Sequence, residues 1–163
     1  MIICSVAQCR QNICHGHLIL LLLIPAWFFL SLVPGDVRAK MVSVNRPVVN
    51  MRSGPGLQSR IDWKLEQGYP LQVIGTRSNW YRVRDFEGDV GWVYAPLTGR
   101  MPHVVVKKKK VNVRSGPGRS YRVVALAGRG VVFRTIKSVK GWVKVRHRNG
   151  VTGWVARHLV WGW

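Results

Sequence analysis

The sequence lacks cysteine beyond residue 14. Cys4, Cys9 and Cys14 are the three cysteines of the 163-residue chain, so the rest of the chain cannot form a disulfide framework or a thiolate metal site. Acidic residues are also scarce, because six Asp and Glu stand against 26 Lys and Arg, a formal net charge of +20. Such a charge predicts an anionic partner or an anionic surface.

The sequence also has little that could carry out catalysis. After residue 40 its histidines are His103, His147 and His158, and none has a metal-binding spacing such as His-Glu-x-x-His. It has no Gly-x-Ser-x-Gly motif and no phosphate-binding glycine loop followed by a helix. A calcium site in the acidic segment 85–89 would be short of ligands. We therefore expect a protein that is not an enzyme, with no cofactor and no metal, and with three surface histidines.

The long apolar run lies near the N-terminus. Residues 18–33 read LILLLLIPAWFFLSLV, and as a helix they would span roughly 24 Å, less than the ~30 Å core of a bilayer. Val37-Arg38-Ala39 then places small residues as a cleavage site does, which is typical of a secretory signal peptide. We expect residues 1–39 to be a signal peptide for export to the periplasm or another extracytoplasmic space. An uncleaved inner-membrane anchor and a true start near Met41 are the alternatives.

The rest of the sequence is a tandem repeat of one unit, with an offset of 62 residues between the two copies. The motif Asn-x-Arg-Ser-Gly-Pro-Gly occupies residues 50–56 and recurs at residues 112–118. The same offset takes Trp80 to Trp142 and the Gly-Trp-Val of 91–93 to 153–155, without a gap. A repeat of this length is one compact module rather than a solenoid turn. We expect two domains, at residues 41–99 and 104–160.

Each copy has the sequence of short strands joined by tight turns, and neither shows a sustained helical period. Three runs of the first copy are rich in valine, aromatic and alternating polar residues, at residues 71–76, 80–84 and 90–93. Pro-Gly at 55–56 and 117–118 predicts type II turns with a positive φ at glycine. Asn149-Gly150 predicts a two-residue hairpin. The predicted fold class is all-β.

The motif Asn-x-Arg-Ser-Gly-Pro-Gly, the strand Trp-(Tyr/Val)-(Arg/Lys)-Val and the segment Gly-Trp-Val together resemble the bacterial SH3-like (SH3b) domain family. The resemblance covers about residues 41–99 and 104–160. It implies two tandem five-stranded, partly open small barrels behind an N-terminal hydrophobic signal or anchor helix. It also implies a cell-wall or envelope binding module, of the kind found in exported bacterial proteins beside or without a catalytic domain.

Alternation along the tryptophan strands predicts which side chains face outward. Successive strand residues point to opposite faces, so the valines should form the core. The outward set is then Trp80, Arg82 and Arg84 in the first copy and Trp142, Lys144 and Arg146 in the second. An outward tryptophan among cations can stack on a sugar ring, peptide plane or base while the cations bind an anion. Alternatively, each tryptophan caps its own barrel or is buried between the modules. We expect Trp92 and Trp154 to be structural.

The two arginines of the repeated motif, Arg52 and Arg114, also have two interpretations. They contact an anionic ligand, or they donate hydrogen bonds to the loop that follows, because a glycine-rich loop leaves many backbone acceptors that need donors.

The positive charge is concentrated in the second copy. Residues 41–100 hold eight basic and five acidic residues, a net of +3, whereas residues 101–163 hold fifteen basic residues and no acid. Four consecutive lysines either form a solvated linker that prevents strand-edge pairing or belong with the other eleven cations to one basic face. Each cation near an anionic surface adds ~1 kcal/mol of binding free energy, and this contribution falls off with distance over about a Debye length. The candidate ligand-binding residues therefore include Arg114, Lys107, Lys108, Lys109 and Lys110.

These observations predict an exported, non-catalytic binding module. The basic second barrel would attach to peptidoglycan or another anionic envelope polymer, while the first barrel is a spacer or docks a protein partner, and the N-terminal segment contacts the membrane if it is retained. The alternative is a nucleic-acid or protein-partner binding adaptor, since small barrels with stacking residues bind single strands; export argues against nucleic acid. Trp161 and Trp163 either cover a seam or insert at a membrane interface.

Overall fold

The protein is built from strands throughout the part that its structure, a computed structural model, describes, which is residues 39–163. These residues form fourteen strands and two short 3-10 turns, with no α-helix among them. Within residues 39–163 there is no helix long and apolar enough to cross a membrane. The all-β prediction is confirmed, whereas the signal peptide or anchor predicted for residues 1–39 lies outside the described residues except for Ala39.

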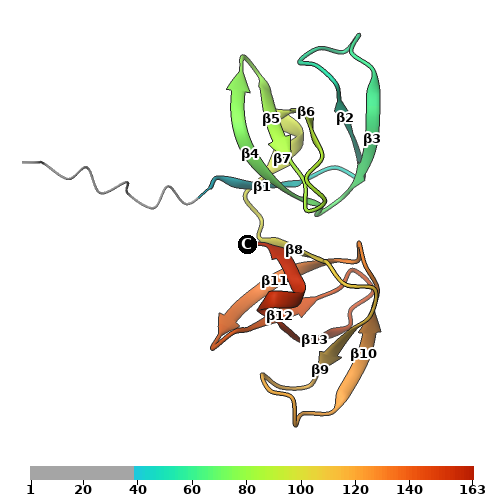
Figure 1. Ribbon diagram of the computed structural model, residues 1–163, viewed down its shortest axis with the longest axis vertical. Coiled ribbons are helices and arrows are strands. Elements are labelled where there is room, and N and C mark those ends of the chain that lie inside the picture. Colours follow the sequence, from blue (N-terminus) through green and yellow to red (C-terminus); the bar gives the residue numbers. More distant parts are fainter. Residues whose placement is uncertain (1–38) are drawn as a thin grey trace, which may run out of the picture. The chain divides into compact units, whose positions relative to one another are not determined.

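The first barrel is a seven-stranded antiparallel sheet (Figure 1) with the strand order β3-β2-β6-β5-β4-β1-β7. Its elements are β1 (Met41–Val44), β2 (Val48–Arg52), β3 (Ile61–Glu66), β4 (Pro70–Arg77), β5 (Trp80–Arg84), β6 (Val90–Tyr94), the 3-10 turn η1 (Ala95–Leu97) and β7 (Thr98–Gly99).

The second barrel repeats this topology with the order β10-β9-β13-β12-β11-β8-β14. Its elements are β8 (His103–Val106), β9 (Val111–Arg114), β10 (Val123–Ala127), β11 (Val132–Val139), β12 (Trp142–Arg146), β13 (Thr152–Ala156), the 3-10 turn η2 (Arg157–Leu159) and β14 (Val160–Gly162). The prediction of two tandem SH3-like barrels is confirmed. Each sheet has seven strands rather than five because short strands at both ends of the module also join it.

Each barrel has its own hydrophobic core, formed by the alternation that the tryptophan strands predict. Val83 of β5 and both Val143 and Val145 of β12 are fully buried, and Tyr81 is half-buried against the first core. The first core contains Val42, Val44, Val49, Met51, Leu65, Leu71, Val83 and Val93. The second contains Val104, Val106, Val111, Val113, Ala127, Phe133, Val143, Val145, Val155 and Val160. The valines thus lie inside and the intervening residues outside.

The loop after the repeated arginine differs from its prediction. Neither Gly56 nor Gly118 has a positive φ, so the expectation of type II turns is wrong. The arginine side chain instead shapes the loop, because Arg52 Nη1 donates hydrogen bonds to the carbonyls of Leu57 at 2.8 Å and Ser59 at 2.7 Å. A guanidinium that bridges two carbonyls fixes the loop without requiring left-handed backbone at the glycine.

The turn between β12 and β13 is longer than predicted. Gly150 and its counterpart Gly88 do have positive φ angles, of 94° and 100°. The connection nevertheless comprises five residues, 147–151, and its ends are joined by a hydrogen bond from the His147 amide to the Val151 carbonyl at 2.8 Å. The glycine requirement was therefore predicted correctly, but the two-residue hairpin was not.

Close backbone approach makes Gly153 of β13 intolerant of any side chain. A Cβ there would lie 2.5 Å from Val113 Cγ1 and 2.8 Å from the carbonyl oxygen of Arg114. Because the backbone of β9 cannot move aside, we expect Gly153→Ala to lower the free energy of unfolding by about 1–3 kcal/mol, as overpacked cores do. Denaturant unfolding would measure this, with the exposed Ser138→Ala of β11 as a control expected to stay within about 0.5 kcal/mol of the parent protein. Equal stability of the two variants would contradict the prediction.

Candidate functional site

Cross-strand register gathers cations and tryptophans on the outer side of the second barrel. Lys144 of β12 pairs with Lys137 of β11 on one side and with Trp154 of β13 on the other. One row further along the strands, Arg146 pairs with Arg134. Paired residues of neighbouring strands lie on the same face of a sheet. We define the basic outer face as Arg114, Arg134, Lys137, Trp142, Lys144, Arg146 and Trp154.

The two tryptophans of the basic outer face differ in exposure. Trp154 is 8% exposed, and Lys137 Nζ lies 5.7 Å from the centre of its ring. Aliphatic stems of Lys and Arg can cover apolar surface while the charges stay in water, so Trp154 acts as the floor of this face, consistent with its expected structural role. Trp142 is half-buried and Arg146 is exposed, so these two remain available to a ligand.

The first barrel has a related outer face with more aromatic character. Trp80 packs against Tyr94 of β6, with ring centroids 5.4 Å apart and a tilt of 58°. Arg82 pairs with Trp92, and Trp92 pairs with Arg52 of β2. Arg82 and the next outward residue of β5, Arg84, are both exposed. The structure therefore places Trp80, Arg82 and Arg84 on one face, as it does Trp142, Lys144 and Arg146.

The repeated arginines contact the loops that follow them. Arg114 Nη1 donates a hydrogen bond to the carbonyl of Tyr121 at 2.7 Å, as Arg52 does in its own loop. The loop-bracing interpretation is thus observed in both copies. Arg114 also pairs with Trp154 across β9 and β13, so its part in ligand binding stays a prediction.

The four lysines of residues 107–110 lie outside the strands of the basic outer face, in the turn between β8 and β9. Lys107 is half-buried and the three that follow are exposed. The backbone of Lys107 is fixed on both sides, because its N–H donates to the Leu159 carbonyl at 3.0 Å and its carbonyl accepts from Arg129 Nη1 at 2.9 Å. The second barrel therefore presents an anchored tetralysine turn as well as the basic outer face.

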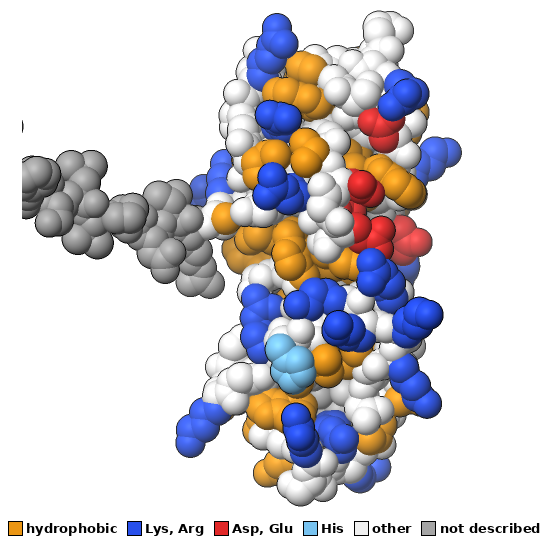
Figure 2. Space-filling model, viewed as in Figure 1, with side chains coloured by type: hydrophobic (Ala, Val, Ile, Leu, Met, Phe, Trp, Pro, Cys, Tyr) orange, Lys and Arg blue, Asp and Glu red, His pale blue; other side chains and the backbone are white. Residues whose placement is uncertain are grey.

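Acidic residues of the first barrel form ion pairs with two of the arginines of the second barrel. Residues 39–163 belong to one compact unit, and within them Glu87 binds Arg129 at 2.7 Å while Glu66 contacts Arg148. The remaining cations of the second barrel have no carboxylate within 4 Å among the described residues. On the face drawn in Figure 2, acidic side chains occur on the first barrel alone and basic ones are spread over the second.

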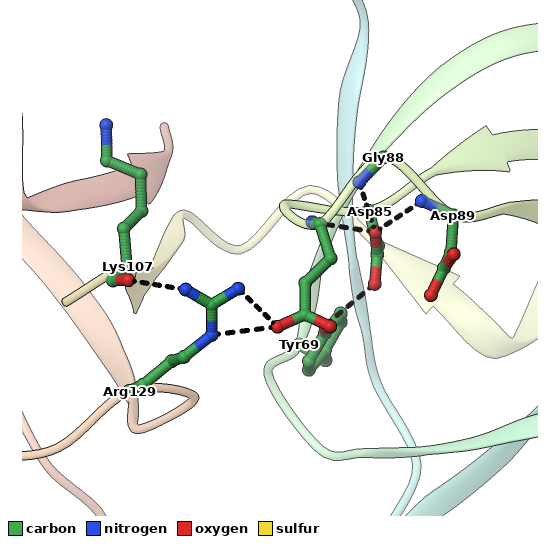
Figure 3. Close-up of polar contacts among 7 residues, drawn as sticks. Tyr69, Asp85, Gly88, Asp89, Lys107 and Arg129 are labelled. Carbon is green, nitrogen blue, oxygen red and sulfur yellow. Dashed lines mark hydrogen bonds and ion pairs between the residues drawn. The ribbon is translucent and has the colours of Figure 1, made fainter. Parts of the chain in front are cut away.

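The acidic turn of the first barrel is organised around one buried carboxylate (Figure 3). Asp85 is 7% exposed, and its Oδ1 accepts hydrogen bonds from the amides of Glu87, Gly88 and Asp89, each at 2.9 Å. Its Oδ2 accepts the hydroxyl of Tyr69 at 3.2 Å. Burial and, secondarily, the Asp85 carboxylate raise the pKa of Tyr69 well above its usual value. Asp85 thus has a structural role, and residues 39–163 contain no cluster of three or more His, Cys, Asp or Glu suited to a metal.

The histidines differ from the expectation that all three lie at the surface. His158 is exposed, but His103 and His147 are half-buried. Burial lowers the pKa of His103, while the His147 ring packs edge-on against Phe133 with centroids 5.5 Å apart. The expectation is therefore wrong for these two residues. Both lie in a strand or turn beside the core, where their rings are partly covered by neighbouring side chains.

Three residues of the two outer faces, Arg134, Lys137 and Tyr94, were not identified from the sequence. Arg134 and Tyr94 stand in regular register with Arg146 and Trp80, so the same alternation applied to the neighbouring strands could have found them. Lys137 could not be found in this way, because its position depends on an irregularity of the β11–β12 pairing.

The fold defines a pair of small antiparallel β-barrel domains with the same strand order. The family model described as "Bacterial SH3 domain" matches residues 45–98 and again residues 107–162. The chain therefore belongs to the bacterial SH3 domain family, with two tandem copies.

A curated protein and several solved structures are similar to parts of this chain. A putative N-acetylmuramoyl-L-alanine amidase, YrvJ of Bacillus subtilis (strain 168), is 28% identical over 123 residues, which cover 69% of this chain and 24% of the amidase. NlpC2 of Trichomonas vaginalis matches with a TM-score of 0.34 and 14% identity, over 76% of this chain and 48% of that structure. An NlpC/P60 family protein of Bacillus cereus ATCC 10987 matches with a TM-score of 0.37 and 10% identity, over 76% and 56%. The chain spans about a quarter of the amidase's length.

Proposed function

We propose that this protein is an exported, non-catalytic module that attaches to peptidoglycan or to another anionic polymer of the cell envelope through its second barrel. The observation that carries the proposal is the basic outer face, in which five cations share one side of the sheet with Trp142 and Trp154, in a barrel whose sequence has no acidic residue. Aromatic rings stack on sugar rings and peptide planes, and adjacent cations bind carboxylates or phosphates.

The family and the chemistry of the relatives support this assignment. Bacterial SH3 domains typically bind the cell wall and usually occur in extracytoplasmic proteins. The alignment with the amidase, over 123 residues, is long enough to include both SH3 copies. Export agrees with the apolar run and small-residue site near the N-terminus, which would place the module in the periplasm or a comparable extracytoplasmic space.

Retention on purified cell-wall sacculi over a salt series tests the proposal. We expect binding at about 0.05 M salt that weakens steadily toward 1 M, because the Debye length shrinks to ~3 Å at the higher concentration. Sacculi stripped of anionic secondary polymers, run in parallel, separate peptidoglycan from those polymers as the ligand. Failure to bind either preparation at the lowest salt would refute the proposed function.

A further inference from the structure

A small apolar cavity opens in the second barrel beside the turn formed by residues 147–151. Its volume is about 160 Å³, smaller than the ~300–1,000 Å³ of sites for drug-sized ligands. This size suits one small side chain rather than a whole small molecule. It is lined by residues of β9, β10 and β11 and of this turn, namely Val113, Ala125, Leu126, Ala127, Val131, Phe133, His147, Asn149 and Val151.

The first barrel carries larger side chains at four of the matching positions. With the offset of 62 residues, Val113, Ala125, Ala127 and Val131 correspond to Met51, Trp63, Leu65 and Tyr69. Met51 is fully buried and Leu65 is 5% exposed, and Tyr69 packs against the same core. At three other lining positions the second copy has the larger residue, namely Phe133, His147 and Val151 in place of Leu71, Asp85 and Asp89. Trp63 is 53% exposed, so the space in the second copy corresponds to the core side chains of Met51, Leu65 and Tyr69 in the first.

The turn beside the cavity also differs from the matching turn of the first barrel. Asp85, which braces the turn of the first barrel through three amide hydrogen bonds, corresponds to His147. In the second barrel the side chain of Asn149 takes over bracing, since its Oδ1 accepts the Val151 amide at 3.2 Å. His147 is thereby free to pack against Phe133 and line the cavity.

The polar groups at this cavity are hydrogen-bond donors. The backbone N–H of Asn149 donates to His147 Nδ1 at 3.4 Å, which assigns the ring proton to Nε2. Neither that Nε2–H nor the Asn149 side-chain NH₂ has a partner among residues 39–163. No acidic residue occurs in the second barrel to compete for them. An apolar wall beside two free donors is complementary to a small aliphatic group next to a carboxylate.

We propose that the cavity is a subsite for the terminal residue of a peptide. Its small aliphatic side chain enters between Ala127 and Val131, and its free carboxylate accepts hydrogen bonds from His147 and Asn149. The inference rests on the proposed function, in which a cell-wall peptide supplies such ends. Because apolar contacts are not screened by salt, this subsite adds a salt-resistant component to binding through the basic outer face.

An NMR titration of the full chain with N-acetyl-alanyl-alanine, in its L and D forms, tests the subsite directly. We expect saturable shifts of the amides of residues 125–127 and 147–151. N-acetyl-glycyl-glycine should bind about tenfold more weakly, since one methyl group in an apolar site contributes about that factor, and the C-terminal amide of the alanine peptide should also bind more weakly. The absence of saturable shifts, or equal affinity for all three probes, would overturn the proposal.

Two variants sharpen this test with residues that the chain itself suggests. Ala127→Leu introduces the residue that the first barrel has at the matching position and should abolish the titration by filling the cavity. Val124→Leu, on the same strand but outside the cavity, is the matched control and should bind normally. Asn149→Asp keeps the oxygen that accepts the hydrogen bond from the Val151 amide, but its negative charge repels a carboxylate. It therefore tests the subsite even if Ala127→Leu does not fold. Unchanged affinity in the folded variants would refute the subsite.

Sacculus binding separates this inference from the proposed function. Ala127→Leu keeps every cation, so its retention on sacculi at low salt should equal that of the parent protein. At 1 M salt the variant should be retained less than the parent protein, because it lacks the salt-resistant contribution of the subsite. Peptide binding without sacculus binding would refute the proposed function and leave the subsite standing. Salt-sensitive sacculus binding without a peptide titration would refute the subsite alone.

Discussion

Replacing all four lysines of residues 107–110 by glutamine should weaken binding to anionic sacculi by about a hundredfold at low salt. Each cation near an anionic surface contributes ~1 kcal/mol, and three of the four side chains are exposed and free of acidic partners among residues 39–163. The half-buried Lys107 should contribute less. The difference should vanish near 1 M salt, where the Debye length is ~3 Å. Sedimentation with sacculi over a salt series measures both effects.

A charge-matched variant of the first barrel distinguishes a local site from overall charge. Replacing Arg46, Arg60, Lys64 and Arg100 by glutamine removes four exposed cations from that barrel and gives the same formal change in charge. We expect this variant to lose only a few-fold in affinity, and both variants to unfold within about 0.5 kcal/mol of the parent protein because the altered positions are mostly at the surface. Equal losses in the two variants would mean that net charge, and not the tetralysine turn, governs attachment.

The fold was predictable because its determinants are local and are repeated. The run 71–76 became β4, one residue longer at each end, and the run 80–84 became β5 with the same bounds. In β5 a period of two places Val83 inside and the two arginines outside, whereas β4 has a register shift between Val73 and Gly75 that interrupts this alternation. The fixed offset then transfers the same assignment to the second copy.

The basic outer face was only partly predictable, because register is not a local property. Simple alternation from Arg134 would place Ile136 outward and Lys137 inward. The pairing shifts between Thr135 and Lys137, so that Lys137 and not Ile136 lies opposite Lys144. A bulge of this kind turns the following side chains to the other face, and nothing in the sequence of β11 marks its position.

The cavity of the second barrel was unpredictable for a related reason. Its lining comes from β9, β10, β11 and the turn 147–151, which meet only in the closed barrel. The sequence does record the exchange of Leu65 for Ala127 and of Tyr69 for Val131. Without knowledge that these positions converge, each exchange is an ordinary difference between two copies.

Asp85→Ala should destabilise the first barrel by about 2–4 kcal/mol. The substitution removes the acceptor of three amide hydrogen bonds and of the Tyr69 hydroxyl, and a buried donor left without a partner costs about 1–3 kcal/mol. The amides of the turn can reach water, which keeps the total below the sum of the separate losses. Because small domains are marginally stable, denaturant unfolding should show an early transition of the first barrel alone.

Two further variants test whether the loss comes from the hydrogen bonds or from the charge. Asp89→Asn removes a carboxylate from the same turn but keeps every hydrogen bond that Asp85 accepts, so it should leave stability within about 0.5 kcal/mol of the parent protein. Asp85→Asn keeps one acceptor oxygen and should lose less than Asp85→Ala. It should also bring the pKa of Tyr69 down toward its usual value, since the carboxylate contributes to the upward shift after burial.

The pH dependence follows from the same pair of residues. A phenol whose pKa is higher in the folded than in the unfolded chain destabilises the fold as pH rises above about 10, because the unfolded chain then releases a proton that the folded chain retains. Asp85→Asn should make this alkaline loss shallower, although it lowers stability at neutral pH. NMR titration of the Tyr69 ring and unfolding at alkaline pH measure the two sides of this linkage. A Tyr69 pKa that is unchanged in Asp85→Asn would show that burial alone, without the carboxylate, keeps the phenol neutral.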